Sequence, residues 1–183
     1  MAFREHIGSA MVSPAAMTQE PPPLPLPSDG LRFIRERVRP EWIDYNGHMN
    51  VAWYVAAFDQ AGEAFLEQIG LGAAYCRQAN ASSFSVEAHI TYQREVHQGD
   101  LLEFRTKLIG FDAKKIHYIQ MMYRVADGLL SSTAEWLILY VDMNTRRTAS
   151  MPEPILERLR DLQRRQADLP LPPEAGRAIK QKG

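Results

Sequence analysis

The segment between Trp42 and Tyr54 gathers side chains that could catalyse the cleavage of an acyl group. It reads WIDYNGHMNVAWY and holds a carboxylate at Asp44, a histidine at His48 and asparagines at positions 46 and 50. A carboxylate can act as a nucleophile or as the base that activates water. A helix is predicted to begin directly behind it, and a helix start presents unpaired N–H groups and a positive dipole end that can stabilise an oxyanion. The segment therefore predicts an acyl-transfer or hydrolysis site.

The helix behind this segment is predicted over residues 51–69. Its apolar residues recur at intervals of four and three, which is typical of one buried helix face; they are Val51, Val55, Phe58, Gly62, Phe65 and Ile69. Asn50 is a favourable N-cap and Gly70 a favourable residue just past the C-terminus. Gly62 has no side chain, so it would let the helix approach a sheet closely.

Strands are predicted on both sides of this helix. An arginine-rich alternating stretch at 31–39 precedes it, and four alternating stretches follow at 84–96, 101–109, 115–125 and 131–142. The last stretch is the most apolar, so we place it centrally, after a hairpin turn at Asp127-Gly128. This order predicts an α+β fold in which an antiparallel sheet of five or more strands wraps around one long helix. Because one helix cannot cover both faces of the sheet, we expect a homodimer or homotetramer.

Proline placement divides the chain into three parts. Residues 1–30 hold six of the twelve prolines, which predicts a disordered tail of polyproline character, with a ligand for an SH3-type domain as the alternative. Residues 31–150 form the predicted folded domain. Residues 151–183 add a helix at 154–167 and a flexible tail.

Composition excludes several classes of protein. No apolar run is long enough to cross a membrane, and 21 basic against 22 acidic residues argue against a nucleic-acid partner bound through bulk positive charge. The single cysteine, Cys76, rules out an intrachain disulfide and is expected to lie in a loop. The first residues lack the continuous apolar core of a secretory signal, so we expect a cytoplasmic protein without a membrane partner.

The pattern DxxGHMNxxxY at residues 44–54 resembles the signature of hotdog-fold acyl-CoA thioesterases, the relatives of 4-hydroxybenzoyl-CoA thioesterase. The predicted element order is that family's order, and residues 92–102 resemble its second recurring stretch. The resemblance covers about residues 33–150. The stretches PEWIDYNGHMN, VEAHITYQREV and GFDAKKIHY resemble, more narrowly, the betainyl-CoA thioesterases of bacterial carnitine degradation, some of which are fused to carnitine dehydrogenase.

The resemblance implies a role for each residue of the motif. Asp44 would be the nucleophile or the base that activates water. Backbone N–H groups near Asn50 and Val51 would form the oxyanion hole, and Gly47 would allow the tight turn that presents them. His48 would orient the loop or assist proton transfer. Many family members carry a second asparagine at the position of Val51. A valine side chain cannot hydrogen-bond, so any role of that asparagine is absent here.

Each of these residues also has a structural reading. Asp44 could be only a turn residue, and a loop histidine such as His48 often bonds backbone groups instead of taking part in chemistry. Asn50 is expected to cap the helix in either case.

Aromatic and basic side chains are candidates for substrate binding. Aromatic cages hold quaternary ammonium groups through cation–π attraction of roughly 0.5–2 kcal/mol per ring, and arginine and lysine suit the phosphates of CoA. The alternatives are packing in the core or at an interface for the aromatic residues, and a solvated turn for the lysines. The aromatic candidates are Trp42, Tyr45, Trp53, Tyr54 and Trp136, and the basic candidates are Arg94, Lys114 and Lys115.

The sequence thus predicts the hydrolysis of an acyl-CoA thioester, with a small polar acyl group such as betainyl. CoA would enter as part of the substrate, and no metal or other cofactor is expected. Two alternatives stay open. One is an enoyl-CoA hydratase or dehydratase that pairs His48 with an acid, and the other is a non-catalytic protein that binds acyl-CoA.

Overall fold

One curled antiparallel sheet carries the fold. The computed structural model describes residues 34–179, and its strands are β1 (Arg35–Arg37), β2 (Ala81–Tyr92), β3 (Leu101–Phe111), β4 (Lys115–Arg124), β5 (Leu129–Asp142) and β6 (Arg147–Thr148). The order across the sheet is β1-β3-β4-β5-β2, β6 pairs with the end of β5, and every pairing is antiparallel. The α+β hotdog prediction is confirmed, including an inner position for the longest strand, β5. The tail predicted at residues 1–30 lies outside the described residues.

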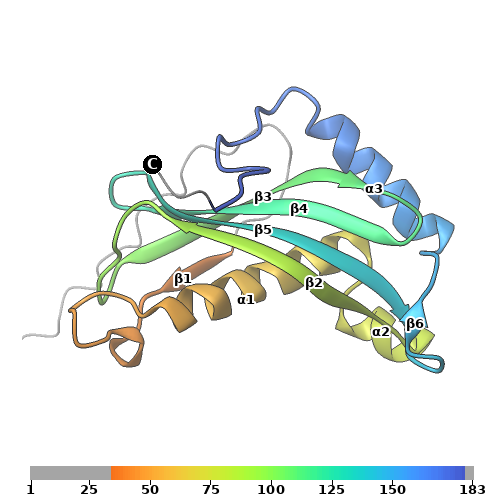
Figure 1. Cartoon of the computed structure of the whole chain (residues 1–183), viewed down its shortest axis with the longest axis horizontal. Coiled ribbons are helices and arrows are strands. Elements are labelled where there is room, and N and C mark those ends of the chain that lie inside the picture. The colour runs from red at the N-terminus through yellow and green to blue at the C-terminus, as the bar shows by residue number, and fades with distance from the viewer. Residues whose placement is uncertain (1–33, 180–183) are drawn as a thin grey trace, which may run out of the picture.

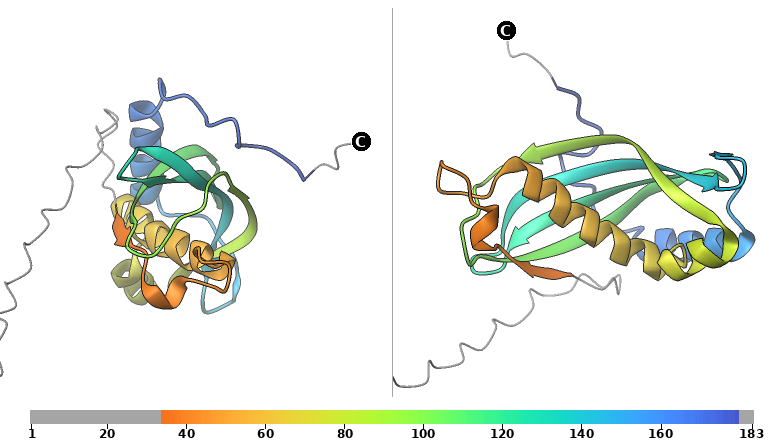
Figure 2. Two further views of the ribbon diagram at one scale, coloured as in Figure 1. Left: turned by 90° about the vertical axis from the view of Figure 1, so that its left-hand side faces the viewer. Right: turned by 90° about the horizontal axis from the view of Figure 1, so that it is seen from below.

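Helix α1 (Val51–Ile69) lies inside the curl of the sheet (Figures 1 and 2). It has the predicted bounds, with Asn50 as N-cap and Gly70 in the left-handed conformation at its C-terminal end. A methyl group placed on Gly62 would lie 3.4 Å from the Tyr118 hydroxyl oxygen, so the missing side chain does permit a close approach to β4. No helix between residues 34 and 179 is long and apolar enough to cross a membrane.

The first two turns of α1 differ from the predicted apolar face. The sheet packs on the side that carries Tyr54, Ala57 and Phe58, all of which are buried. Val51 and Val55 therefore point away from the sheet, and their side chains are 56% and 38% exposed. The expectation that they belong to the buried face was wrong.

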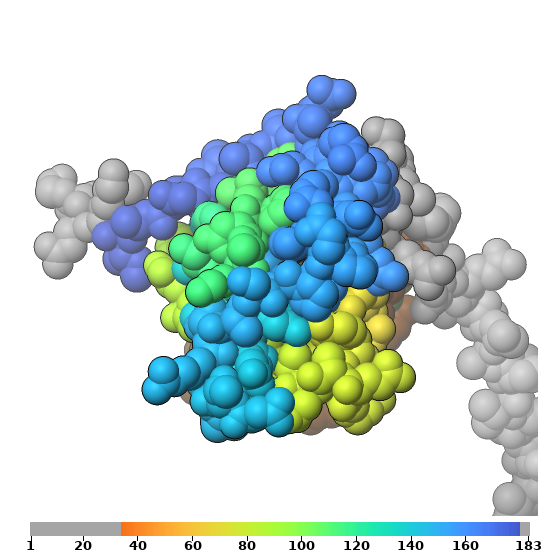
Figure 3. Space-filling model, turned by 90° about the vertical axis from the view of Figure 1, so that its right-hand side faces the viewer, coloured from red at the N-terminus to blue at the C-terminus, as the bar shows by residue number. Residues whose placement is uncertain are grey.

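The far half of the core is closed by two further helices, α2 (Ala73–Ala79) and α3 (Glu153–Arg165). The apolar face of α3, with Ile155, Leu159 and Leu162, packs into one cluster with the last turns of α1. Figure 3 shows this end of the molecule, where α2, α3 and the β5–β6 turn crowd together. Helix α2 was not predicted, because it is only seven residues long and fully buries none of them. Cys76 lies in this helix and not in a loop as expected.

Strand β2 forms one edge of the sheet, and its pattern differs from the predicted alternation. It begins at Ala81 and ends at Tyr92, and its register with β5 shifts between Ser85 and Glu87. Val86 lies at this shift and is 52% exposed, although the alternation predicted at 84–96 places it on one apolar face with Ala88, Ile90 and Tyr92. The irregularity interrupts the alternation of faces on which that assignment rested. The first strand is also shorter than predicted, since β1 covers only Arg35–Arg37.

The outer face of the sheet is covered in part by the chain's own C-terminal segment. The side chain of Gln166, just past α3, accepts a hydrogen bond from the Leu108 N–H at 2.8 Å and donates one to the Thr106 carbonyl oxygen at 2.9 Å. These groups lie on the edge of β3 beyond β1, so the amide satisfies backbone groups that the sheet leaves unpaired. Further along, the Gly176 N–H donates to Glu135 Oε2 at 2.7 Å on β5. The segment is therefore held against the sheet as far as Gly176, and it covers part of the face that the sequence analysis expects a second chain to cover.

Replacing Gln166 with leucine should destabilise the fold. The variant would leave two buried backbone groups of β3 without a partner, at a cost of about 2 kcal/mol in the free energy of unfolding. Gln163→Leu is the matched control, because Gln163 is exposed on α3. Denaturant unfolding of both variants tests this, and equal stability of the two would show that the Gln166 amide does not hold the β3 edge.

Candidate active site

The residues predicted to be catalytic lie on a tight turn between η1 (Pro40–Trp42), a single turn of 3-10 helix, and α1. Ile43 and Met49 form an isolated antiparallel bridge, and the Asp44 N–H donates to the His48 carbonyl oxygen at 3.1 Å. The turn closes with a hydrogen bond from the Gly47 N–H to the Asp44 carbonyl oxygen at 3.0 Å. Gly47 has a φ of +84°, which disfavours any other residue at this position. The tight turn expected at Gly47 is present.

The carboxylate of Asp44 is held on both of its oxygens. Oδ1 accepts a hydrogen bond from the Asn46 N–H at 2.8 Å, and Oδ2 accepts one from Asn50 Nδ2 at 3.3 Å. The other side-chain atom of Asn50, Oδ1, accepts from the Ala52 N–H at 3.0 Å and so caps α1. Asn50 therefore ties the carboxylate to the start of the helix, and each carboxylate oxygen keeps a further lone pair for a substrate or a water.

The backbone donors at the start of α1 are fewer than expected. The Asn50 N–H donates to the Trp42 carbonyl oxygen at 2.8 Å, and the Trp53 N–H donates to the Asn50 carbonyl oxygen at 3.0 Å. Asn50 therefore cannot supply its own N–H to an oxyanion hole in this conformation. The Val51 N–H has no hydrogen-bond partner within residues 34–179, which leaves it as the donor nearest to the turn.

A cavity of about 560 Å³ opens beside the turn. Of the predicted catalytic residues, Asp44, His48, Asn50 and Val51 line it, while Gly47 lies on the turn behind. Of the predicted substrate-binding residues, Tyr45, Tyr54 and Arg94 line it as well. Its remaining lining residues are Met49, Tyr92, Gln93 and Glu95.

The sequence reasoning missed most of the wall formed by residues 92–95. The predicted strand runs to residue 96, whereas β2 ends at Tyr92 and leaves Gln93 and Glu95 in a loop beside the cavity. The signal that could have found it is the antiparallel topology, which brings the end of β2 back to the helix start. The Met49 N–H donates to the Val96 carbonyl oxygen at 2.9 Å and fixes this proximity.

His48 lines the cavity but makes no hydrogen bond to Asp44. Its Nδ1 lies 3.4 Å from the Met49 carbonyl oxygen, and its Nε2 lies 3.8 Å from Glu95 Oε1. The second distance is too long for a hydrogen bond, although it would suit an ion pair if the imidazole were protonated. These contacts favour the loop-orienting role of His48 over proton transfer with Asp44.

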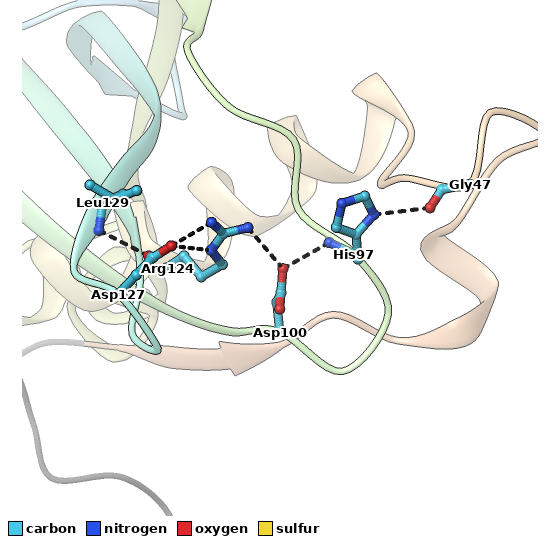
Figure 4. Close-up of polar contacts among 6 residues, drawn as sticks. All are labelled: Gly47, His97, Asp100, Arg124, Asp127 and Leu129. Carbon is cyan, nitrogen blue, oxygen red and sulfur yellow. Dashed lines mark hydrogen bonds and ion pairs between the residues drawn. The ribbon is translucent and has the colours of Figure 1, made fainter.

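A chain of polar contacts anchors the turn to the body of the sheet (Figure 4). His97 Nδ1 lies 3.1 Å from the Gly47 carbonyl oxygen, and the His97 N–H donates to Asp100 Oδ2 at 2.9 Å. Asp100 faces Arg124 at 3.9 Å, and Arg124 pairs with Asp127 in the β4–β5 turn. The hydrogen bond from Arg124 lowers the pKa of the Asp127 carboxyl group, so this pair stays charged at neutral pH. His97 is a positioning residue that the sequence did not reveal.

Three of the predicted aromatic residues do not line the cavity. Trp42 is buried, and its ring stacks on that of Trp53 with centroids 5.4 Å apart. The pair instead packs beside the turn, which matches the structural alternative for both. Trp136 lines a separate, smaller cavity further along α1.

Lys114 and Lys115 lie at the opposite end of the sheet from the cavity. Lys115 is level with Leu139 on β5, whereas Tyr92 at the cavity is level with Ser132. Seven residues along β5 separate the two positions, or roughly 23 Å. Within one chain the two lysines are therefore not brought together with Asp44.

Two substitutions of Asn50 should separate its effect on catalytic activity from its effect on stability. Asn50→Ala would lose the helix cap, about 1 kcal/mol of folding free energy, and the hydrogen bond to Asp44. Asn50→Ser keeps a good cap but has no N–H group for Asp44, so we expect near wild-type stability with thioester cleavage reduced about tenfold. Thermal unfolding and turnover of both variants test this. A serine variant with full turnover would show that the Asn50–Asp44 contact does not position the carboxylate.

Comparison with known proteins identifies the family. The sequence matches the Thioesterase-like superfamily over residues 38–159. It is 34% identical over 142 residues to the betainyl-CoA thioesterase of Pseudomonas aeruginosa, covering 78% of this chain and 89% of that protein. It is 38% identical over 150 residues to the L-carnitine dehydrogenase/betainyl-CoA thioesterase of Agrobacterium fabrum, covering 82% of this chain but only 30% of that longer protein.

Solved structures agree with the sequence comparison. A hypothetical Staphylococcus aureus protein in complex with CoA superposes with a TM-score of 0.78 and 26% identity, covering 82% of this chain and 94% of the other. A putative thioesterase from Pseudomonas putida KT2440 superposes with a TM-score of 0.72 and 30% identity, covering 82% and 96%. The predicted family is confirmed: the chain belongs to the thioesterase-like superfamily and is a thioester hydrolase.

Proposed function

We propose that the chain hydrolyses an acyl-CoA with a small cationic acyl group, betainyl-CoA first among them, to the free acid and CoA. The observation that carries this proposal is the Asp44 carboxylate, held by Asn46 and Asn50 at the mouth of a cavity beside the start of α1. The choice of betainyl rests on the relatives named as betainyl-CoA thioesterases, one of which this chain covers over 89% of its length. A cytoplasmic location stays a prediction.

The proposed reaction needs only groups of this chain and water. The substrate's carbonyl oxygen lies toward the Val51 N–H, where that donor and the helix dipole stabilise the negative charge of the tetrahedral intermediate. Asp44 acts by one of two routes: it adds to the carbonyl carbon, and water then hydrolyses the resulting anhydride, or it takes a proton from the attacking water. In both routes the carbon–sulfur bond breaks, the CoA thiolate leaves and takes up a proton, and the acid is released. No cofactor is consumed.

The chain is proposed to work as a homodimer joined through β2. This strand has a free edge among the described residues, and its centre, residues 85–88, is exposed. Long exposed edges with apolar side chains are templates for pairing with another strand. The C-terminal segment covers part of the outer face, which disfavours a tetramer packed through that face.

Such a dimer also offers a place for the two distant lysines. If the β2 strands of two copies pair antiparallel about a two-fold axis, the Phe84 end of one strand lies beside the Tyr92 end of the other. Lys115 shares the Phe84 end, because both are level with Leu139. The partner copy could thereby present Lys114 and Lys115 to CoA phosphates, while Arg94 is contributed by the chain that holds the acyl group.

Removing the Asp44 carboxylate should abolish most of the activity. Asp44→Ala is expected to lower kcat for betainyl-CoA at least about a hundredfold, the range lost with a catalytic acid or base. Asp59→Asn is the matched control, because Asp59 is an exposed carboxylate on α1 away from this cavity. Thiol release, measured with a thiol-reactive dye, gives the turnover of both variants. Wild-type turnover in the Asp44→Ala variant would overturn the proposed role.

A charge on the β2 edge should disrupt the dimer. Val86→Lys places an ammonium group at the exposed centre of the strand, whereas Gln163→Lys adds the same group to an exposed position of α3. We expect the wild type and the control to have twice the chain mass of 20.8 kDa in light scattering after gel filtration, and Val86→Lys to approach the single-chain mass. A monomeric wild type, or an unchanged Val86→Lys mass, would contradict pairing through β2.

A further inference from the structure

The acyl group of the proposed substrate constrains where its charge can lie. In a betainyl thioester the ammonium nitrogen is two covalent bonds from the carbonyl carbon, a separation of roughly 2.5 Å. This inference rests on the proposed function, which places the carbonyl between Asp44 and the Val51 N–H. The group that recognises the cation must therefore line the same cavity as Asp44.

The smaller cavity along α1 does not meet this condition. It measures about 80 Å³ and is lined by Asp59, Glu63, Tyr118 and Trp136 among others, which would also suit a cation. Asp59 is five residues beyond Tyr54 on α1, which corresponds to a rise of about 7.5 Å. An ammonium two bonds from the reacting carbon cannot reach that far, so the acids of this second cavity are excluded as its counter-charge.

The charges around the main cavity favour a cation. Its titratable lining residues other than histidine and tyrosine are the acids Asp44 and Glu95 and the base Arg94, which gives a formal charge of −1. Arg94 Nη1 donates to the Leu130 carbonyl oxygen at 3.1 Å, so its guanidinium is engaged with β5. The Glu95 side chain is 67% exposed, and within residues 34–179 the ion-pairing group nearest to it is His48 Nε2 at 3.8 Å. Glu95 therefore keeps its carboxylate available to a ligand.

Two tyrosines supply aromatic walls. The rings of Tyr54 and Tyr92 lie 5.1 Å apart between centroids and make an angle of 85°, which forms a right-angled corner of the cavity. Tyr54 is only 4% exposed, so its ring is fixed by packing, whereas Tyr92 is half exposed. Both phenols are neutral at physiological pH, and burial raises the pKa of each still further from that range. Neutral aromatic faces at right angles suit a quaternary ammonium, which binds rings and cannot donate a hydrogen bond.

We infer that Glu95, Tyr54 and Tyr92 form a subsite that selects acyl groups with a quaternary ammonium. Glu95 supplies the opposite charge and the two rings supply cation–π contacts, all in the cavity that holds Asp44. This assignment replaces the tryptophan pair, Trp42 and Trp53, which the sequence suggested for the same task.

The experiment compares two thioesters of equal shape and different charge. Tert-butylacetyl-CoA has a carbon atom where betainyl-CoA has its nitrogen, so the ratio of the two kcat/KM values isolates recognition of the charge. We expect the wild type to prefer betainyl-CoA. Glu95→Gln should lower that ratio about fivefold, the value of one partly exposed ion contact, while leaving the neutral ester within about twofold. Tyr92→Leu should lower the ratio as well, whereas Tyr92→Phe keeps the ring and the ratio.

Glu157→Gln is the matched control for Glu95→Gln, because Glu157 is an exposed acid of α3 that does not line the cavity. If the wild type cleaves both esters and the ratio is unchanged in Glu95→Gln and Tyr92→Leu, the subsite is wrong and the thioesterase stands. An equal loss on both esters would also overturn it, since it would reveal a role unrelated to charge. If the wild type cleaves neither ester, the proposed function itself fails, and this inference fails with it.

Discussion

The side chain of Asn50 links the Asp44 carboxylate to the first turn of α1, and the candidate site depends on that link. One amide makes both contacts, with Nδ2 facing Asp44 and Oδ1 facing the Ala52 N–H. The backbone of Asn50 is held as well, by its hydrogen bond to the Trp42 carbonyl oxygen. The helix start, the carboxylate and the Val51 N–H are therefore linked to one another by contacts within residues 42–52. What the sheet adds is the opposite wall of the cavity, through the residues that follow β2.

The two ends of the molecule differ in packing: the end at α2 and α3 is closed, and the end that carries the candidate site is open. At one end α2 and α3 close the core, and Gln166 satisfies two backbone groups on the edge of β3. At the other end apolar and aromatic side chains stay accessible, including Tyr45 at 97% and Tyr92 at 49% exposure. Such exposure costs hydrophobic stabilisation and is typical of surfaces that receive a ligand or another chain. The His97–Asp100–Arg124 contacts hold the turn at this open end, together with the buried side chains of Trp42 and Met49.

Much of the fold could be predicted because its signals are local. Asn50 and Gly70 mark the ends of α1, and Asp127-Gly128 marks the β4–β5 turn. The errors arose where tertiary context decides: Val51 and Val55 belong to the apolar pattern, yet the sheet does not reach them. In the site, the motif residues were found by their spacing, but Glu95, His97 and the Tyr54–Tyr92 corner depend on how β2 returns to the helix start. Gln166 could not be assigned either, since nothing in its neighbours along the chain shows that β3 has an unpaired edge.

The central claim is that the thioester carbonyl lies between Asp44 and the start of α1. The most direct test is a crystal structure with a betainyl-CoA analogue in which a methylene group replaces the sulfur, so that the ketone is retained but cannot be hydrolysed. The account predicts the ketone oxygen within hydrogen-bonding distance of the Val51 N–H, the ketone carbon facing the Asp44 carboxylate, and the ammonium in the Tyr54–Tyr92 corner. An acyl group bound in the smaller cavity by Asp59 and Glu63, or anywhere remote from Asp44, would contradict it.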